Sequence, residues 1–119
     1  RDGLVAIAVQ AAVKTDPGYV QFVRAATLES VATIAVGALP DMLTFTPDGT
    51  RLIVANEGEP SDDGTVDPVG SVSIIDVRDP RRPTVRTAEF DAFNGRAAEL
   101  RARGVRLAGA GVSVAQDVE

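Results

Sequence analysis

The chain has 119 residues, enough for one domain of ordinary size, and 45% of them are apolar, which excludes an intrinsically disordered segment. Its net charge of −5 argues against binding to nucleic acid, which needs an excess of Lys and Arg, and no apolar run is long enough to insert into a membrane. Cys and His are both missing, so disulfides, thiolate chemistry and histidine-based catalysis are excluded.

Short apolar or alternating runs separated by Gly and Pro predict an all-β, antiparallel fold. The first run, residues 4–11, is continuously apolar, which is typical of a strand buried on both faces. Pro-Asp-Gly at residues 47–49 predicts a tight turn. One short helix is expected near residues 97–103, with Asn94 as a possible N-cap and Gly104 as the stop signal. Strands are expected over residues 4–11, 19–25, 31–38, 42–46, 51–56, 70–77, 84–90 and 112–115.

The chain also carries an internal repeat. The run that begins at Leu4 is matched with the run that begins at Leu52, and Tyr19 is matched with Ser71. A period near 50 residues with about four strands per period is typical of β-propeller blades. A generic antiparallel meander, whose hairpins resemble each other by chance, is the alternative.

A propeller needs about four to eight blades, so two such units do not close a ring. We therefore expect residues 1–119 to be a partial β-propeller domain, about two blades of a larger propeller, with the rest supplied by a longer chain. The repeat units are placed at about residues 4–51 and 52–119. The chain begins at Arg1 without an initiator Met, so we expect it to be processed or excerpted from something longer.

Five carboxylates crowd one connection between two predicted strands, the acidic loop of residues 57–67. A solvated loop is the plainest interpretation, and direct catalysis by Glu57 or Glu59 is another. A third is a calcium site, because calcium prefers carboxylate and carbonyl oxygens and would relieve the mutual repulsion of these charges. The spacing is not that of an EF-hand. The candidate metal ligands are Glu57, Glu59, Asp62, Asp63 and Asp67.

Three further polar residues lie at predicted strand ends. Asn56 ends a strand, where we expect its side chain to satisfy loose backbone donors. Asp117 and Glu119 follow the last apolar run, as Glu57 and Glu59 follow an earlier one. Functional groups of propellers gather where strand ends meet the central channel, so Asp117 and Glu119 are predicted to face that channel.

The stretch "GALPDMLTFTPDGTRLIVANEGEPSDDGTVDPVGSVSIID", with "FDAFNG", "GVRL" and "VAQDVE" further on, resembles the secreted choice-of-anchor I proteins. Those proteins are a group related to esterase-like and phytase-like propellers, and the stretch is also similar to the YVTN-type propellers. The resemblance implies a secreted, periplasmic or cell-surface propeller.

Two functions stay open on this basis. One is a non-catalytic module for binding or scaffolding at the cell surface. The alternative is a calcium-dependent phosphoesterase, similar to alkaline phosphatase, whose site is completed by blades outside this chain. The sequence does not decide whether the protein is an enzyme.

Overall fold

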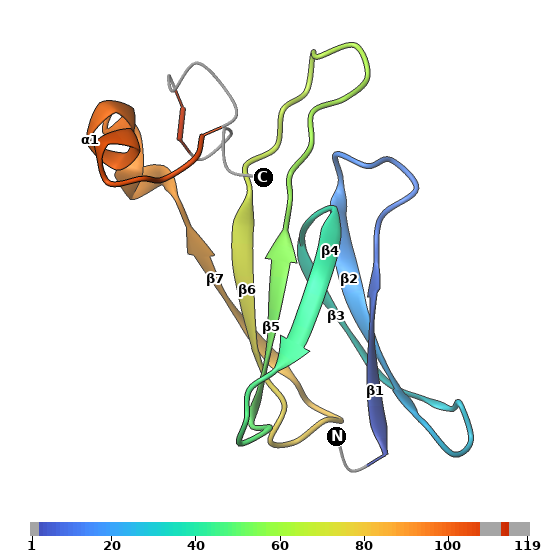
Figure 1. Ribbon diagram of the computed structural model, residues 1–119. Coiled ribbons are helices and arrows are strands. Elements are labelled where there is room, and N and C mark those ends of the chain that lie inside the picture. The colour runs from blue at the N-terminus through green and yellow to red at the C-terminus, as the bar shows by residue number, and fades with distance from the viewer. Residues whose placement is uncertain (1–2, 108–112, 115–119) are drawn as a thin grey trace.

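A computed structural model describes residues 3–107 and 113–114 of the chain and places strands β1–β7 in two antiparallel sheets, with one short α-helix (Figure 1). The all-β prediction and the single short helix are therefore confirmed for the described residues. The elements are β1 (Leu4–Val9), β2 (Pro17–Arg24), β3 (Ser30–Ala38), β4 (Pro40–Phe45), β5 (Arg51–Asn56), β6 (Ser71–Asp76), β7 (Thr84–Glu89), the 3-10 turn η1 (Asp91–Phe93) and α1 (Ala97–Ala102).

The first sheet has the strand order β1-β2-β3 and the second has the order β4-β5-β6-β7. The chain passes from one sheet to the other at Leu39, whose positive φ of 49° turns the backbone between β3 and β4. The predicted repeat units group β4 with the first three strands, whereas its hydrogen bonds join it to β5. The propeller itself stays a prediction.

The core lies between the two sheets. The first sheet contributes Val20, Phe22 and Val36, and the second contributes Leu52, Val54, Ile75 and Val77. Burying each of these large side chains stabilises the fold by about 1.5–3 kcal/mol. Each strand alternates its side chains between the core and the opposite face of its sheet, which we call the outer face.

The prediction that the first strand is buried on both faces is wrong. The side chains of β1 alternate in burial, and Val5 and Ile7 on its outer face are 39% and 41% exposed. The strand also ends at Val9, two residues before the end of the apolar run. The apolar run was continuous because both faces carry apolar residues, although only one of them is covered by the second sheet.

The pairing registers of the two sheets show how their strands correspond. The six β1–β2 pairs run from Leu4 with Arg24 to Val9 with Tyr19, and the six β5–β6 pairs run from Arg51 with Asp76 to Asn56 with Ser71. Superposing the pairs makes Val5 equivalent to Leu52. This alignment keeps Tyr19 at the position of Ser71 and shifts Leu4 by one residue from Leu52, and the repeat itself stays a prediction. Such a slip moves every side chain to the other face of the sheet.

The two sheets approach closely where β3 passes β5 and β6. A Cβ atom added to Gly37 would lie 2.8 Å from Asn56 Cβ and 2.8 Å from Ser71 Oγ, so only glycine fits there. Asn56 is buried, and its Nδ2 donates hydrogen bonds to Ser71 Oγ (3.1 Å) and Ser73 Oγ (2.9 Å). The expectation that Asn56 caps backbone donors is wrong, because its amide joins β5 to β6 through side chains.

A second, smaller core surrounds the helix. Ala97 and Leu100 of α1 pack with Val114, which is 2% exposed. The helix begins after Arg96, and no side chain caps it, so the predicted N-cap at Asn94 is wrong. The stop at Gly104 is confirmed by its φ of +86°, a conformation that favours glycine.

The predicted last strand, residues 112–115, lies partly outside the described residues. Its described members, Ser113 and Val114, are not in a strand.

Replacing Gly37 with Ala should lower the free energy of unfolding by about 1–3 kcal/mol, because Asn56 and Ser71 must move to admit the methyl group. Urea denaturation measures the change. The control is Ala35→Val at an exposed position of the same strand, which should change stability far less. Equal stability of the Gly37→Ala variant and the unmodified chain would contradict this account of the sheet contact.

Candidate functional site in the acidic loop

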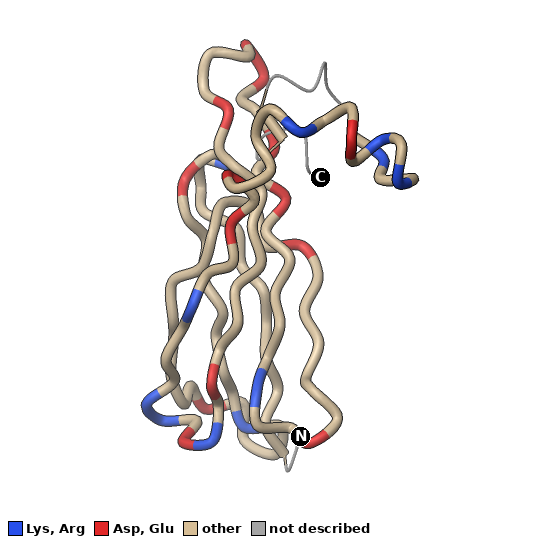
Figure 2. Tube along the Cα trace, turned by 90° about the vertical axis from the view of Figure 1, so that its left-hand side faces the viewer, with Lys and Arg blue, Asp and Glu red and all other residues tan. Residues whose placement is uncertain are grey.

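The acidic loop lies in the connection from β5 to β6, residues 57–70, which extends beyond the sheets at one end of the molecule (Figure 1). Acidic residues gather at this end (Figure 2). The equivalent connection in the first sheet, from β1 to β2, covers only residues 10–16. The connection that carries the acidic loop is therefore the longer of the two.

Backbone contacts fix the base of the loop. Glu57 N donates to Leu39 O (3.0 Å) and Gly58 N donates to Ala38 O (3.2 Å), so the loop begins by binding the turn between the two sheets. Gly58 has a φ of +69°, and a Cβ atom there would lie 2.7 Å from the carbonyl carbon of Val69. The two arms of the loop therefore touch at their base.

The tip of the loop is a hydrogen-bonded turn centred on Asp63. Its Oδ1 accepts hydrogen bonds from Ser61 Oγ (2.7 Å), Thr65 N (3.1 Å) and Thr65 Oγ1 (2.8 Å). Ser61 N donates to Val66 O (2.8 Å), and Gly64 takes a φ of +69°. Asp63 thus holds the turn in shape, as short polar side chains often do.

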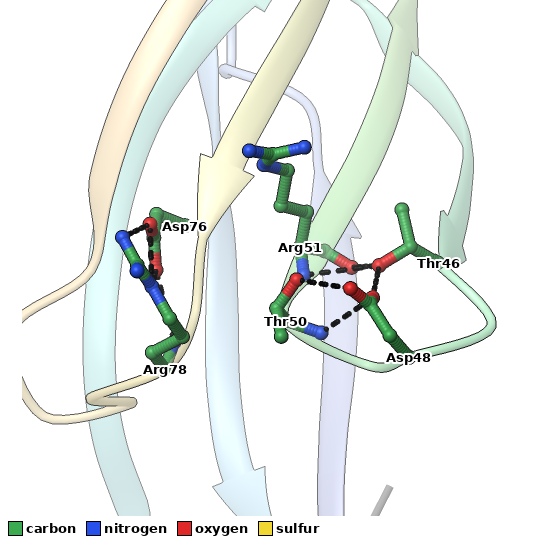
Figure 3. A network of polar contacts seen from close by, with 6 residues as sticks. All are labelled: Thr46, Asp48, Thr50, Arg51, Asp76 and Arg78. Atoms are coloured by element: carbon green, nitrogen blue, oxygen red, sulfur yellow. Dashed lines mark hydrogen bonds and ion pairs between the residues drawn. The ribbon is translucent and has the colours of Figure 1, made fainter.

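A second turn of the same kind, centred on Asp48, joins β4 to β5 (Figure 3). There Asp48 Oδ1 accepts from Thr46 Oγ1 (2.6 Å) and Thr50 N (3.0 Å), and Asp48 Oδ2 accepts from Thr50 Oγ1 (2.8 Å). Gly49 has a φ of +63°. The two segments read Thr-Pro-Asp-Gly-Thr and Ser-Asp-Asp-Gly-Thr, so the sequence carried a signal for the second turn that composition alone had hidden.

The hydrogen bonds of these turns lower the pKa of both carboxyl groups. The hydroxyl of Ser61 and the amide and hydroxyl of Thr65 lower the pKa of Asp63 to about 2. The equivalent donors, Thr46 first, lower the pKa of Asp48 to about 2. Donors aimed at a carboxylate favour its charged form, so both turns are formed with ionised Asp.

A lysine of the first sheet reaches the loop. Lys14 lies in the β1–β2 connection, and its Nζ is 2.8 Å from Asp62 Oδ1 and 3.9 Å from Glu59 Oε2. The hydrogen bond to Asp62 raises the pKa of Lys14, and the same bond lowers the pKa of Asp62. Because the Asp62 side chain is 97% exposed, this pair contributes little to stability. Its effect is to place a positive charge among the carboxylates.

The five predicted ligands do not converge. Asp62 and Glu59 face Lys14, Asp63 holds the turn, and Glu57 lines a shallow pocket of about 220 Å³ with Asp41 and Phe90. In the part of the chain that the structure describes, no three acidic side chains lie close enough together to hold one metal ion. Calcium binding therefore stays a prediction. Asp117 and Glu119, the predicted channel-facing acids, lie outside the described residues.

Comparison with protein families identifies the chain. The family model of the choice-of-anchor I domain matches residues 1–119. The chain belongs to the choice-of-anchor I family. Comparisons with curated proteins and with solved structures gave no significant match. No helix among residues 3–107 and 113–114 of this choice-of-anchor I domain is both long and apolar enough to cross a membrane.

Removing one donor to Asp63 should raise its pKa. In the Thr65→Val variant, the loss of a hydroxyl donor should move the pKa of Asp63 from about 2 toward 3.8. NMR titration of the carboxyl group measures the shift. The pKa of Asp63 is lowered by folding, so ionisation favours the turn above about pH 4 and this contribution is lost as the pH falls toward 2.

The matched variant is Thr50→Val, which removes the equivalent hydroxyl from Asp48. It should raise the pKa of Asp48 and leave that of Asp63 unchanged. An Asp63 carboxyl that titrates near 3.8 in the unmodified chain would show that the turn does not form in solution.

Proposed function

We propose that the chain forms two adjacent blades of a β-propeller that acts as a binding or scaffold module outside the cell or at its surface. The observation that supports two blades is the residue-by-residue correspondence of the strand pairs in the two sheets. In the superposed registers, the exposed residues Val5 and Ile7 are equivalent to Leu52 and Val54, which are fully buried. A further sheet on that outer face would bury them in the same way.

The proposed surface role is supported by the description of the family as an anchored domain and by the chain's chemistry. A choice-of-anchor domain suggests a protein that is held at the cell exterior. The acidic loop gives such a module one charged end, and its base and tip are both fixed by hydrogen bonds. A prearranged loop loses less conformational entropy when it binds a partner than a loose one does.

No observation on the described residues favours the phosphoesterase alternative. It stays a prediction, and an assay against a generic phosphate ester with and without a chelator addresses it. Measurable turnover that the chelator abolishes would replace the binding role with a hydrolytic one.

The surface role predicts that the chain binds isolated cell envelopes of the cells that produce it. Shortening residues 57–70 to the length of the β1–β2 connection should weaken binding to envelopes, measured by co-sedimentation, by about tenfold. This is a loss of roughly 1.4 kcal/mol of binding free energy. The control replaces Arg81 and Arg82, which lie in the β6–β7 connection, with Ala. Equal binding by the shortened variant and the unmodified chain would remove the acidic loop from the proposed function.

We also propose that the acidic loop binds calcium. A calcium ion there must compete with Lys14 for Asp62 and Glu59. At a calcium concentration a hundred times the dissociation constant, binding should stabilise the fold by about 2.7 kcal/mol. Melting curves with calcium and with a chelator measure this difference. Lys14→Met should strengthen the effect, and Asp62→Asn with Asp63→Asn should remove it. Calcium at this loop would be excluded if the curves with calcium and with chelator coincide both for the unmodified chain and for Lys14→Met.

A further inference from the structure

A cleft of about 390 Å³ opens between the two sheets, at the end of the molecule opposite the acidic loop. The β4–β5 and β6–β7 connections and the last residues of β2 lie at this end (Figure 1). Both sheets contribute to the lining of the cleft. Its volume is in the range of pockets that bind small molecules in other proteins.

Apolar side chains from both sheets line the cleft and continue the core. Leu4 and Phe45 pack against the core cluster, and Val77 is a buried member of that cluster. Pro80 of the β6–β7 connection adds a fourth apolar group. The core is therefore open at this end, and an apolar group that entered the cleft would be removed from water as a core side chain is.

A charged residue, Arg24, stands where the pattern of β2 favours an apolar one. Val20 and Phe22 face the core and are fully buried, and the alternation of the strand directs Arg24 to the same side. Arg24 pairs with Leu4 across the two strands, and both residues line the cleft. In the part of the chain that the structure describes, the Arg24 guanidinium forms no hydrogen bond or ion pair.

The second arginine of the cleft already has a counter-ion. Arg78 Nε donates to both carboxylate oxygens of Asp76, at 3.0 Å each, so the charge of this guanidinium is neutralised. None of the described residues that line the cleft is acidic. The described lining therefore carries one uncompensated positive charge, that of Arg24, beside apolar walls.

We propose that this cleft binds a small monocarboxylate with an apolar body, that is, an aliphatic or aromatic acid. Its carboxylate accepts hydrogen bonds from the planar fork of the Arg24 guanidinium, a geometry that suits carboxylates. Its apolar body lies against Leu4, Phe45 and Val77. A dianion would need a second free cation, which the described lining does not offer. The cleft and the acidic loop lie at opposite ends, so this proposal and envelope binding by the loop fail independently.

The test is an NMR titration of the full chain with hexanoate, followed through the backbone amides. Saturable shifts are expected at Leu4, Thr50 and Arg78, which line the cleft, and not in the acidic loop. Acetate should bind more weakly than hexanoate, by about fourfold for each methylene that the longer acid buries. Hexanol has a similar apolar body but no charge, and it should bind at least about tenfold more weakly than hexanoate.

Substitutions in the protein provide the second arm. Arg24→Gln removes the charge and should weaken hexanoate binding by about tenfold. The matched control is Arg86→Gln, because Arg86 is an exposed arginine of β7 that does not line the cleft, and this variant should bind as the unmodified chain does. Circular dichroism shows whether each variant is folded, and the ligand series tests the proposal on the unmodified protein even where a variant unfolds.

The proposal would be overturned by equal binding of hexanoate to Arg24→Gln and to the unmodified chain. Equal affinity of the unmodified chain for hexanoate and for acetate or hexanol would also overturn it, as would the lack of saturable shifts at the cleft. Shifts confined to the cleft, affinity that rises with the length of the acid and a loss specific to Arg24→Gln support it.

Discussion

The two sheets can stack only because β3 carries no side chain at Gly37. At that point the backbone of the first sheet lies against Asn56 and Ser71 of the second, with no space for a methyl group. This contact sets the separation of the sheets at the end where the chain crosses from β3 to β4. The acidic loop begins from the same place, through the bond from Glu57 N to Leu39 O. The packing of the core and the position of the loop are therefore coupled.

Two levels of repetition organise the molecule. The sheets repeat the pairing of their hairpins, and the turns at Asp48 and Asp63 repeat the same pattern of donors. The turn at Asp63 lies within the longer β5–β6 connection, where it gives a defined shape to a segment that has no counterpart in the first sheet. Lys14 of the shorter connection then neutralises part of the charge of the longer one. Repulsion among the carboxylates is eased by a lysine from the neighbouring sheet.

Much of the fold could be predicted from the sequence. β5 was predicted with its observed bounds, and β4, β6 and β7 within one or two residues, because turns built on Pro, Gly and Asp separate these strands sharply. The errors have physical causes. The continuous apolar run of β1 gave no alternation from which to read its faces. The site was harder, because a list of five carboxylates does not say which of them are occupied by neighbours.

The sequence by itself determined the all-β class, the family, the approximate positions of β1–β7 and the one short helix of the described residues, since these depend on local periodicity, turn residues and a long continuous motif. Only the tertiary structure decided which strands share a sheet, which face of β1 is covered and where Lys14 meets Asp62 and Glu59. The contacts of Lys14 join residues 45 and 48 positions apart in the chain. The energy of all these features comes from burial and charge contacts that no local pattern encodes. The turn at Asp63 is local in sequence and could have been predicted, but its acidic neighbours hid it, so it was recognised only from the structure.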